Sequence, residues 1–354
     1  MIEYQTQRSF TFNQLADDCL RAANVWKDIG LRVGQTFGIC GHNSYEYMVC
    51  FLSGIIIGAI AIPMRGTDTI DEFKRTLKER EISLIALSGE KLRQIKSHDF
   101  YDNIMGIVFG SESDHQNETH FWVYENLISS TRAISEDLIH EPKDVMQDIC
   151  LILESSGTTG LPKGCMFSHY NLVSLVTIGS LVYNRTAEDI VSGHSYMAHI
   201  SGVNQLIMSI NNGSQLVLHP VFNLNTLFEA IEKHGITALS APASVYMTLL
   251  KAGTEYDIST LRKLICGGAP LPKGCAQQIA HKYPHFEDFR QSYGMTEMTI
   301  LIAFGHYGRR DYESVGDPTP GNRIKVIDCT TGEVLPPNCN GEICVTGPTL
   351  FKGI

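Results

Sequence analysis

Short apolar segments alternate with segments of helical periodicity along most of this chain, and this alternation strongly limits the folds it can adopt. Residues 36–40, 59–62 and 83–87 are apolar and have the length of buried strands. The residues between them, 44–56 and 70–79, carry apolar side chains at helical spacing. Strands separated by helices form parallel sheets with helices on both faces. The sequence therefore predicts an α/β fold of two packed, mostly parallel sheets flanked by helices.

The texture of the sequence changes at three places, which predicts four regions. A first α/β sub-domain is expected at residues 1–110, and a connecting segment at 111–146, where the apolar pattern dissolves. The apolar residues 149–153 open a second series, so a second sub-domain is expected at 147–321. Residues 322–354 contain two strand-like runs without a helix between them, which predicts an incomplete β sub-domain. In the second series, helices are expected at 170–181, 203–210, 224–234, 243–251 and 272–283, and strands at 215–218, 237–239, 263–266 and 286–289.

Composition and charge indicate a globular protein and exclude some partners. Hydrophobic residues make up 43% of the 354 residues and charged residues 19%, without a bias toward disorder. The formal net charge is −10, which argues against nucleic acid or an anionic membrane surface as the main partner. The longest apolar run, residues 48–63, is short for a membrane span and contains two glycines, so no membrane span is expected.

The ten cysteines are scattered and form neither a C-x-x-C pair nor a cluster with zinc spacing. Buried, reduced thiols are the natural interpretation of this pattern, and they indicate a reducing compartment. The N-terminal residues are polar, so no secretory leader is expected. The predicted location is intracellular, either cytoplasmic or peroxisomal.

A run of hydroxyl residues and glycines follows the apolar residues 151–153 and suggests a phosphate-binding loop. Glycines let backbone N–H groups approach an anion closely, hydroxyl groups add donors, and Lys163 adds a positive charge. An ordinary surface loop is the alternative, but the length and regularity of the run argue against it. The predicted nucleotide-binding residues of this loop are Ser155, Ser156, Gly157, Thr158, Thr159, Gly160 and Lys163.

The spacing of this loop excludes a Walker-type site. A Walker loop requires Gly-x-x-x-x-Gly-Lys-Ser/Thr, whereas here Leu161 and Pro162 separate Gly160 from Lys163. A P-loop kinase is therefore ruled out. The run instead resembles the signature of the AMP-binding, adenylate-forming enzymes, which include acyl-CoA synthetases, 4-coumarate–CoA ligases, beetle luciferases and the adenylation domains of peptide synthetases.

A second cluster, residues 290–297, resembles the Gln-Gly-Tyr-Gly-Met-Thr-Glu hallmark of the same family. By this resemblance Tyr293 lies along the adenine ring, Thr296 hydrogen-bonds a phosphate, and Glu297 helps to hold Mg²⁺. A carboxylate suits such a hard cation, which offsets triphosphate charge. Ser292 stands where the family favours glycine. The resemblance assigns to the nucleotide site Gln291, Ser292, Tyr293, Gly294, Met295 and Thr296.

A third segment follows the apolar residues 263–266 and consists of two glycines, an alanine and a proline. Taken alone, it terminates a strand and starts a helix, with the proline near the first turn. In the family the matching segment passes close to the adenine, where only small residues fit. The resemblance therefore adds to the nucleotide site Gly267, Gly268, Ala269 and Pro270.

A fourth segment, residues 194–202, matches the family's Pro-x-Phe-His-x-x-Gly region, with His199 at the motif histidine. Tyr196 and Ala198 replace the usual proline and phenylalanine. In relatives this segment borders the pocket for the carboxylate substrate. A catalytic role and a purely structural role of His199 both remain open. The residues predicted to act in catalysis are Lys163, His199, Thr296 and Glu297.

The last match, residues 341–347 and 352–353, resembles a family segment that continues beyond the position of Ile354. In the family, a Thr-Gly-Asp motif, a hinge and a C-terminal domain with a reactive-site lysine follow. The resemblance therefore covers nearly all of this chain but only part of a full enzyme. This chain alone is expected to keep the ATP and acid sites and to have weak or absent overall activity.

By this resemblance the full-length protein uses ATP and Mg²⁺ to activate a small-molecule carboxylic acid as acyl-AMP and passes the acyl group to coenzyme A. The sequence does not name the acid. A luciferase-like or peptide-synthetase adenylation domain is one alternative. A non-catalytic short form that binds a nucleotide or an acyl group is another.

Overall fold

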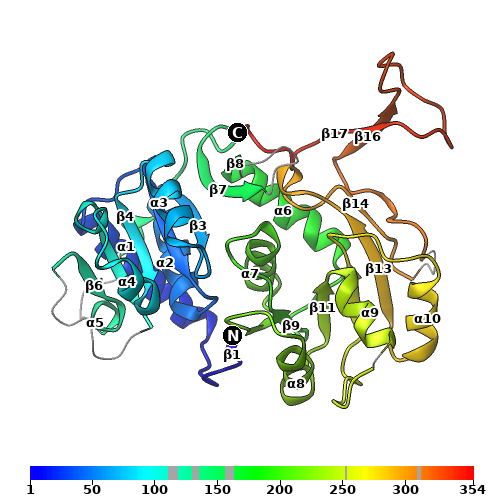
Figure 1. The fold of residues 1–354 in the computed structure, drawn as a ribbon, viewed down its shortest axis with the longest axis horizontal. Helices are drawn as coiled ribbons and strands as arrows, with labels where there is room; N and C mark the ends of the chain where they lie inside the picture. Colours follow the sequence, from blue (N-terminus) through cyan, green and yellow to red (C-terminus); the bar gives the residue numbers. More distant parts are fainter. Residues whose placement is uncertain (111–118, 130–134, 156–162, 252, 309–311) are drawn as a thin grey trace.

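The computed structural model describes residues 1–110, 119–129, 135–155, 163–251, 253–308 and 312–354. Two α/β lobes lie side by side, and α6 (His169–Val182) and α7 (Ile200–Asn212) lie between them (Figure 1). A hairpin of β16 (Arg323–Ile327) and β17 (Glu342–Thr346) projects from the second lobe (Figure 1). The predicted fold class, two mostly parallel sheets flanked by helices, is confirmed.

The first sheet has seven strands in the order β6-β5-β4-β2-β3-β7-β8. All neighbours are parallel except β7 and β8, which form an antiparallel pair. Parallel strands that are buried on both faces have continuous apolar sequences, which is why these strands could be recognised in the sequence. The strands are β2 (Thr36–Gly41), β3 (Ile60–Arg65), β4 (Leu84–Ser88), β5 (Met105–Phe109), β6 (Phe121–Val123), β7 (Ile149–Ser155) and β8 (Lys163–Ser168).

The second sheet has eight strands in the order β1-β10-β9-β11-β12-β13-β14-β15. It is parallel from β1 to β13 and antiparallel at its β14–β15 edge. The strands are β1 (Ile2–Glu3), β9 (Ile190–Gly193), β10 (Gln215–Leu218), β11 (Ala238–Ala241), β12 (Lys263–Cys266), β13 (Asp288–Tyr293), β14 (Ala303–Phe304) and β15 (Asp317–Pro318).

Local capping residues set the ends of several helices. Thr11, Thr69 and Ser168 each accept a hydrogen bond from the backbone three residues on, in reciprocal capping boxes. Gly213 and Gly235 end α7 and α8 in the left-handed conformation that favours glycine. The remaining helices are α1 (Phe12–Asp28), α2 (Tyr45–Ile56), α3 (Ile70–Glu79), α4 (Gly89–Ile95), α5 (Tyr124–Ile128), α8 (Leu224–His234), α9 (Ala243–Lys251) and α10 (Cys275–Lys282).

Helix α7 joins the two sheets through one continuous apolar core. Its buried Val203 and Leu206 belong to the same cluster as Phe37 of the first sheet and Leu216 of the second. Each fully buried side chain of this kind contributes about 1.5–3 kcal/mol relative to exposure. The cluster therefore fixes the two sheets against each other and sets the geometry of anything that lies between them.

Two strand predictions were wrong. The apolar residues 149–153 were expected to open the second series, but β7 pairs with β3 and completes the first sheet. A strand was expected at 286–289, but β13 runs from Asp288 to Tyr293 and so contains half of the cluster at 290–297. The expected connecting segment also contains β6 and α5. The proposed region boundaries at residues 110, 146 and 321 stay a prediction.

All ten cysteines are free, and seven of them are buried, in agreement with the expectation of reduced thiols. Cys329 and Cys339 are exposed and Cys344 is half-buried; all three lie in or near the projecting hairpin. Within the described residues, no helix has both the length and the apolar character that crossing a membrane requires.

Candidate functional site

A cavity of about 700 Å³ opens at the carboxyl ends of β11, β12 and β13, where the β7–β8 pair of the first sheet faces the second sheet. Ligands bind at this edge in open α/β sheets, because loops from neighbouring strands converge there. Ten of the predicted residues line the cavity: Ser155, Lys163, His199, Gly267, Gly268, Ser292, Gly294, Met295, Thr296 and Glu297.

Four predicted residues lie beside the cavity and do not line it. Ala269 and Pro270 are exposed at the end of β12. The Gln291 amide donates a hydrogen bond to the Tyr312 carbonyl oxygen at 2.6 Å, and the Tyr293 ring is 37% exposed. Outside the described residues lie Ser156, Gly157, Thr158, Thr159 and Gly160.

Two polar groups of the β7–β8 pair are available to a ligand. Ser155 and Lys163 are register partners at the cavity, joined by the segment 156–162. Ser155 Oγ is buried and makes no hydrogen bond to the described residues, apart from the weak partner offered by the neighbouring Cys165 thiol. Among the described residues no carboxylate oxygen lies within 4.0 Å of Lys163 Nζ. A hydroxyl and an ammonium group that find so few partners in the described part of the chain suit an anionic ligand.

Residues 294–300 form a tight turn that brings Thr296 and Glu297 to the cavity. The backbone of Gly294 passes so close to Ile300 that a Cβ atom would lie 1.4 Å from the Ile300 carbonyl oxygen. Thr299 and Ile300 have φ values of 47° and 74°, a region that β-branched residues rarely adopt. Such strain costs of the order of 1–3 kcal/mol per residue and persists only where surrounding contacts enforce it.

The contacts that hold this strained turn are short hydrogen bonds. The backbone N–H groups of Thr299 and Ile300 donate to the carbonyl oxygens of Thr296 and Met295, both at 3.0 Å. The fully buried Thr299 hydroxyl donates to the Thr349 carbonyl oxygen at 2.6 Å. Strain stored next to a cavity is typical of functional sites.

Small residues shape the wall formed by β12 and β13. A Cβ atom on Gly267 would lie 2.5 Å from Ser292 Oγ, so these two positions are matched in size. Gly268 has a φ of 78°, and no atom lies within 4 Å of the position that a Cβ atom would take. The Ser292 hydroxyl on β13 donates a hydrogen bond to the Cys266 carbonyl oxygen at 3.5 Å, so it points toward the neighbouring strand β12. The serine that departs from the family pattern is therefore accommodated by a neighbouring glycine.

His199 is the N-cap of α7 and borders the cavity. Its Nδ1 atom accepts the backbone N–H of Ser201 at 3.1 Å and lies 2.8 Å from the Ser201 hydroxyl. Because Nδ1 is an acceptor here, the proton of the neutral ring is on Nε2. Desolvation by surrounding protein atoms, and then the charge of Arg65, lower the pKa of His199, although its ring is open to the cavity. The ring is therefore neutral near pH 7 and offers one donor.

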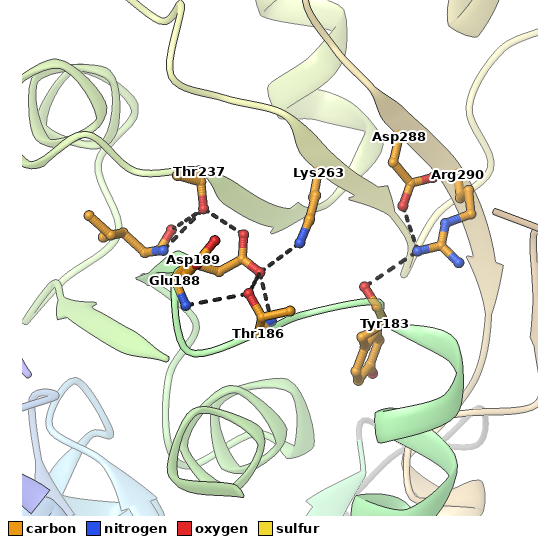
Figure 2. Close-up of polar contacts among 9 residues, drawn as sticks. Tyr183, Thr186, Glu188, Asp189, Thr237, Lys263, Asp288 and Arg290 are labelled. Atoms are coloured by element: carbon orange, nitrogen blue, oxygen red, sulfur yellow. Dashed lines mark hydrogen bonds and ion pairs between the residues drawn. The ribbon is translucent and has the colours of Figure 1, made fainter. Parts of the chain in front are cut away.

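Two buried ion pairs support the strands that end at the cavity (Figure 2). Arg290 of β13 lies 2.6 Å from Asp288 and donates to the Val182 carbonyl oxygen at 2.7 Å. Lys263 of β12 lies 2.7 Å from Asp189, which also accepts hydrogen bonds from the Thr186 N–H and the Thr237 hydroxyl. The Lys263–Asp189 pair connects β12 to the chain between α6 and β9, and the Arg290 hydrogen bond connects β13 to the last residue of α6.

The Asp189 pair predicts a pH dependence of stability. Burial alone would raise the pKa of Asp189, but Lys263 and the two hydrogen bonds hold it below its usual value. A depressed carboxyl pKa stabilises the folded state above the unfolded pKa of about 4, and this contribution is lost as the pH falls through the folded pKa. Asp189→Asn is therefore expected to be clearly less stable than the wild type at pH 6, and the gap should narrow below about pH 4. Urea denaturation of both proteins at several pH values measures it, and a gap that stays constant with pH would contradict it.

Sequence reasoning missed several residues that line the cavity. Tyr183 follows α6, Asn204 and Gln205 lie on α7, and Ser240 lies on β11. The available signal was a pair of polar residues within the apolar pattern of α7, because buried polar residues need a partner or a function. Among the described residues no group of three or more His, Cys, Asp or Glu side chains forms a metal cluster, so Glu297 is a single carboxylate at the cavity.

A family-wide comparison decides where this chain belongs. The sequence matches the family model described as AMP-binding enzyme over residues 1–354. The chain belongs to the AMP-binding enzyme family. The predicted resemblance to adenylate-forming enzymes is thereby confirmed.

Individual relatives of this AMP-binding enzyme are longer than the chain. It is 27% identical over 370 residues to a 4-coumarate–CoA ligase of Pinus taeda, covering 100% of this chain and 66% of the ligase. It is 25% identical over 358 residues to a luciferin 4-monooxygenase of Photinus pyralis, covering 98% of this chain and 64% of that protein. The chain therefore spans less than two thirds of either relative.

Solved structures share the fold of the AMP-binding chain. A long-chain-fatty-acid-CoA ligase from Archaeoglobus fulgidus has a TM-score of 0.86 at 23% identity, covering 98% of this chain and 69% of the ligase. ATP-bound MatB from Rhodopseudomonas palustris has a TM-score of 0.85 at 24% identity, covering 99% and 67%. The likeness shows that the arrangement of the two sheets is the one these structures have.

Proposed function

We propose that this chain binds ATP and a carboxylic acid in the cavity at the ends of β11, β12 and β13 and activates the acid as acyl-AMP. A carboxylate oxygen attacks the α-phosphorus of ATP, the bond from that phosphorus to the bridging oxygen breaks, and pyrophosphate leaves. The observation that carries the proposal is that Lys163, Ser155 and Thr296 converge on one cavity. Among the described residues, the weak Cys165 thiol beside Ser155 is the one side-chain partner that these three groups have. Membership of the AMP-binding family and the similarity to CoA ligases support it.

The proposal gives each wall of the cavity a role. The flat wall of Gly267 and Gly268 receives the adenine, with Ala269, Pro270 and Tyr293 at its rim. Lys163, Ser155 and Thr296 hold the phosphates, because ammonium and hydroxyl donors match phosphate oxygens. The predicted loop residues between Ser155 and Lys163 complete this cradle in the proposal. Gln291 does not line the cavity and acts indirectly: its hydrogen bond to the Tyr312 carbonyl oxygen holds β13 in place.

Glu297 is the proposed protein ligand of Mg²⁺. One carboxylate fits this ion, which keeps several waters and takes its other ligands from substrate phosphates. When bound, Mg²⁺ offsets negative charge on the phosphates. The neutral His199 ring offers its Nε2 proton to the acid, which orients the carboxylate toward the α-phosphorus. No nucleophile of the protein takes part.

Transfer of the acyl group to coenzyme A is proposed for a protein that also has the additional length of its relatives. An intracellular location, cytoplasmic or peroxisomal, is part of the same proposal and agrees with the free thiols. A chain that binds the nucleotide and acid without turning them over remains the alternative, and binding and turnover assays separate the two.

The test is the melting temperature of this chain with and without a non-hydrolysable acyl-AMP analogue, an acyl-sulfamoyladenosine. An analogue at 100 times its dissociation constant should add about 2.7 kcal/mol of stability. That gain corresponds to an upward shift of several degrees for a chain of this size. A folded sample whose melting temperature does not respond to any acyl length would overturn the proposal.

Lys163→Met is expected to weaken ATP binding by about tenfold or more, since the lysine pairs with phosphate charge in a partly desolvated site. Adenosine lacks phosphates, so its affinity should remain unchanged in the same variant. Calorimetric titration of both ligands measures the difference. The control is Lys325→Met on the exposed face of the projecting hairpin, which should bind ATP like the wild type. Equal losses for ATP and adenosine would show that the lysine acts on the fold and not on the phosphates.

A further inference from the structure

Arg185 lies directly behind the cavity wall, beside Ser240 and Tyr183. Its neighbours Arg290 and Lys263 are paired with Asp288 and Asp189 at 2.6 and 2.7 Å. Among the described residues no carboxylate oxygen lies within 4.0 Å of the Arg185 guanidinium, and its Nε atom is buried without a hydrogen-bond partner. Within the described residues, the Arg185 guanidinium therefore has no carboxylate in ion-pair contact.

The guanidinium of Arg185 acts on two residues that line the cavity. One terminal nitrogen donates a hydrogen bond to Ser240 Oγ at 2.7 Å, and the guanidinium carbon lies 5.1 Å from the centre of the Tyr183 ring. Ser240 and Tyr183 both face the cavity. Burial lowers the pKa of Arg185, which is the expected effect on a desolvated cation, while Tyr183 and Asp189 act in the opposite direction. Arg185 is half-buried, so its positive charge acts at this wall with less screening by water than at an exposed site.

The Ser240 and Tyr183 hydroxyl groups of this wall each accept one hydrogen bond and are therefore free to donate one to a ligand. Ser240 Oγ accepts its bond from Arg185, and the Tyr183 hydroxyl accepts one from the Asn204 amide at 2.9 Å. Each hydroxyl still has one proton to donate. The described residues offer no acceptor to either proton in hydrogen-bond geometry. A donor that is itself polarised by a cation makes a stronger hydrogen bond.

We propose that the acid activated here is a dicarboxylic acid, whose second carboxylate is bound by the hydroxyls of Tyr183 and Ser240 in front of Arg185. This inference rests on the proposed function and names its substrate class. A carboxylate only accepts hydrogen bonds, so it satisfies both donors, and its charge offsets that of Arg185. A tail that ends in a methyl group would bury both donors without partners. Ile265, Ile300 and Leu301 also line the cavity and supply apolar contacts for the carbon chain between the two carboxylates.

Matched pairs of analogues test this assignment. Succinyl-, glutaryl- and adipoyl-sulfamoyladenosine are compared with counterparts in which an isopropyl group of similar shape replaces the terminal carboxylate. At pH 7 the wild-type chain should bind at least one carboxylate-ended analogue about tenfold or more tightly than its isopropyl counterpart, as expected for hydrogen bonds to a charged group. Equal or tighter binding of all isopropyl analogues overturns the dicarboxylate and leaves the proposed function intact. Failure of every analogue to bind folded protein instead overturns the proposed function.

Variants locate the preference. Arg185→Met should abolish the preference for the carboxylate-ended analogue and bind the isopropyl analogue within about twofold of wild type, since only the charged tail meets the cation. Ser240→Ala removes one donor and keeps Arg185, so it should reduce the preference by a smaller factor. This second variant tests the proposal if Arg185→Met does not fold. Arg262→Met, at an exposed arginine, is the control and should keep the full preference. A preference that survives in both Arg185→Met and Ser240→Ala would contradict the proposed site.

Discussion

Gly294→Ala is expected to abolish binding of adenylate analogues and to destabilise the chain by about 3 kcal/mol or more, because a new Cβ atom meets fixed backbone. That atom would lie 1.4 Å from the Ile300 carbonyl oxygen. Relief requires residues 294–300 to move, and this turn positions Thr296 and Glu297. The strained φ values of Thr299 and Ile300 leave the turn little freedom to adjust.

Urea denaturation and analogue titration measure the two effects of Gly294→Ala. The matched control is Gly332→Ala, at a glycine with a φ of 75° and open space around its Cα atom. That variant should cost only about 1 kcal/mol, from backbone conformation alone, and should bind analogues normally. Wild-type affinity in Gly294→Ala would show that the turn does not shape the binding site.

Arg290→Met is expected to cost about 3–5 kcal/mol, because it leaves Asp288 as an unpaired charge in the interior. The two side chains are only 4% and 2% exposed, and the guanidinium also lies 4.7 Å from the centre of the Phe304 ring. Its hydrogen bond to the Val182 carbonyl oxygen joins β13 to the end of α6, and a longer one reaches the Tyr183 carbonyl oxygen at 3.4 Å (Figure 2). Loss of the arginine therefore removes a counter-ion, a packing contact and a connection between elements.

Urea denaturation of single and double variants separates these effects. Asp288→Leu/Arg290→Met should be more stable than Arg290→Met alone, because no buried charge is then left unpaired. Lys74→Met is the control, since it breaks an exposed pair whose side chains are 47% and 77% accessible, and it should change stability little. A loss in Arg290→Met as small as that in Lys74→Met would contradict the assigned role of the buried pair.

The fold class was accessible from the sequence because buried parallel strands are short, continuous apolar runs and amphipathic helices carry apolar residues at helical spacing. The sheet to which each strand belongs was not. The apolar residues 149–153 predict a buried strand but do not indicate its sheet. The pairing of Leu151 with Ala61, which is distant in sequence, places β7 in the first sheet. The extent of β13 was also hidden, because Asp288 and Arg290 are charged and become compatible with burial only by pairing with each other.

The same distinction holds for the candidate site. Its glycine and hydroxyl runs are contiguous in sequence, so composition and spacing revealed them. The wall behind the proposed acid is assembled from α6, α7 and β11, and no local pattern predicts that Tyr183, Asn204 and Ser240 meet. Arg185 belongs to no motif in the sequence, and only the fold brings its guanidinium to Ser240.

The most direct test of the account is a crystal structure of this chain with a bound acyl-sulfamoyladenosine. We expect the purine to lie against Gly267 and Gly268, and the sulfamoyl group to lie near Lys163 and Thr296. A second cavity of about 330 Å³ provides the internal comparison. It is lined in part by Arg8, by His42 after β2 and by Phe109 at the end of β5. Occupation of that second cavity, with the cavity at the ends of β11, β12 and β13 empty, would contradict the central claim.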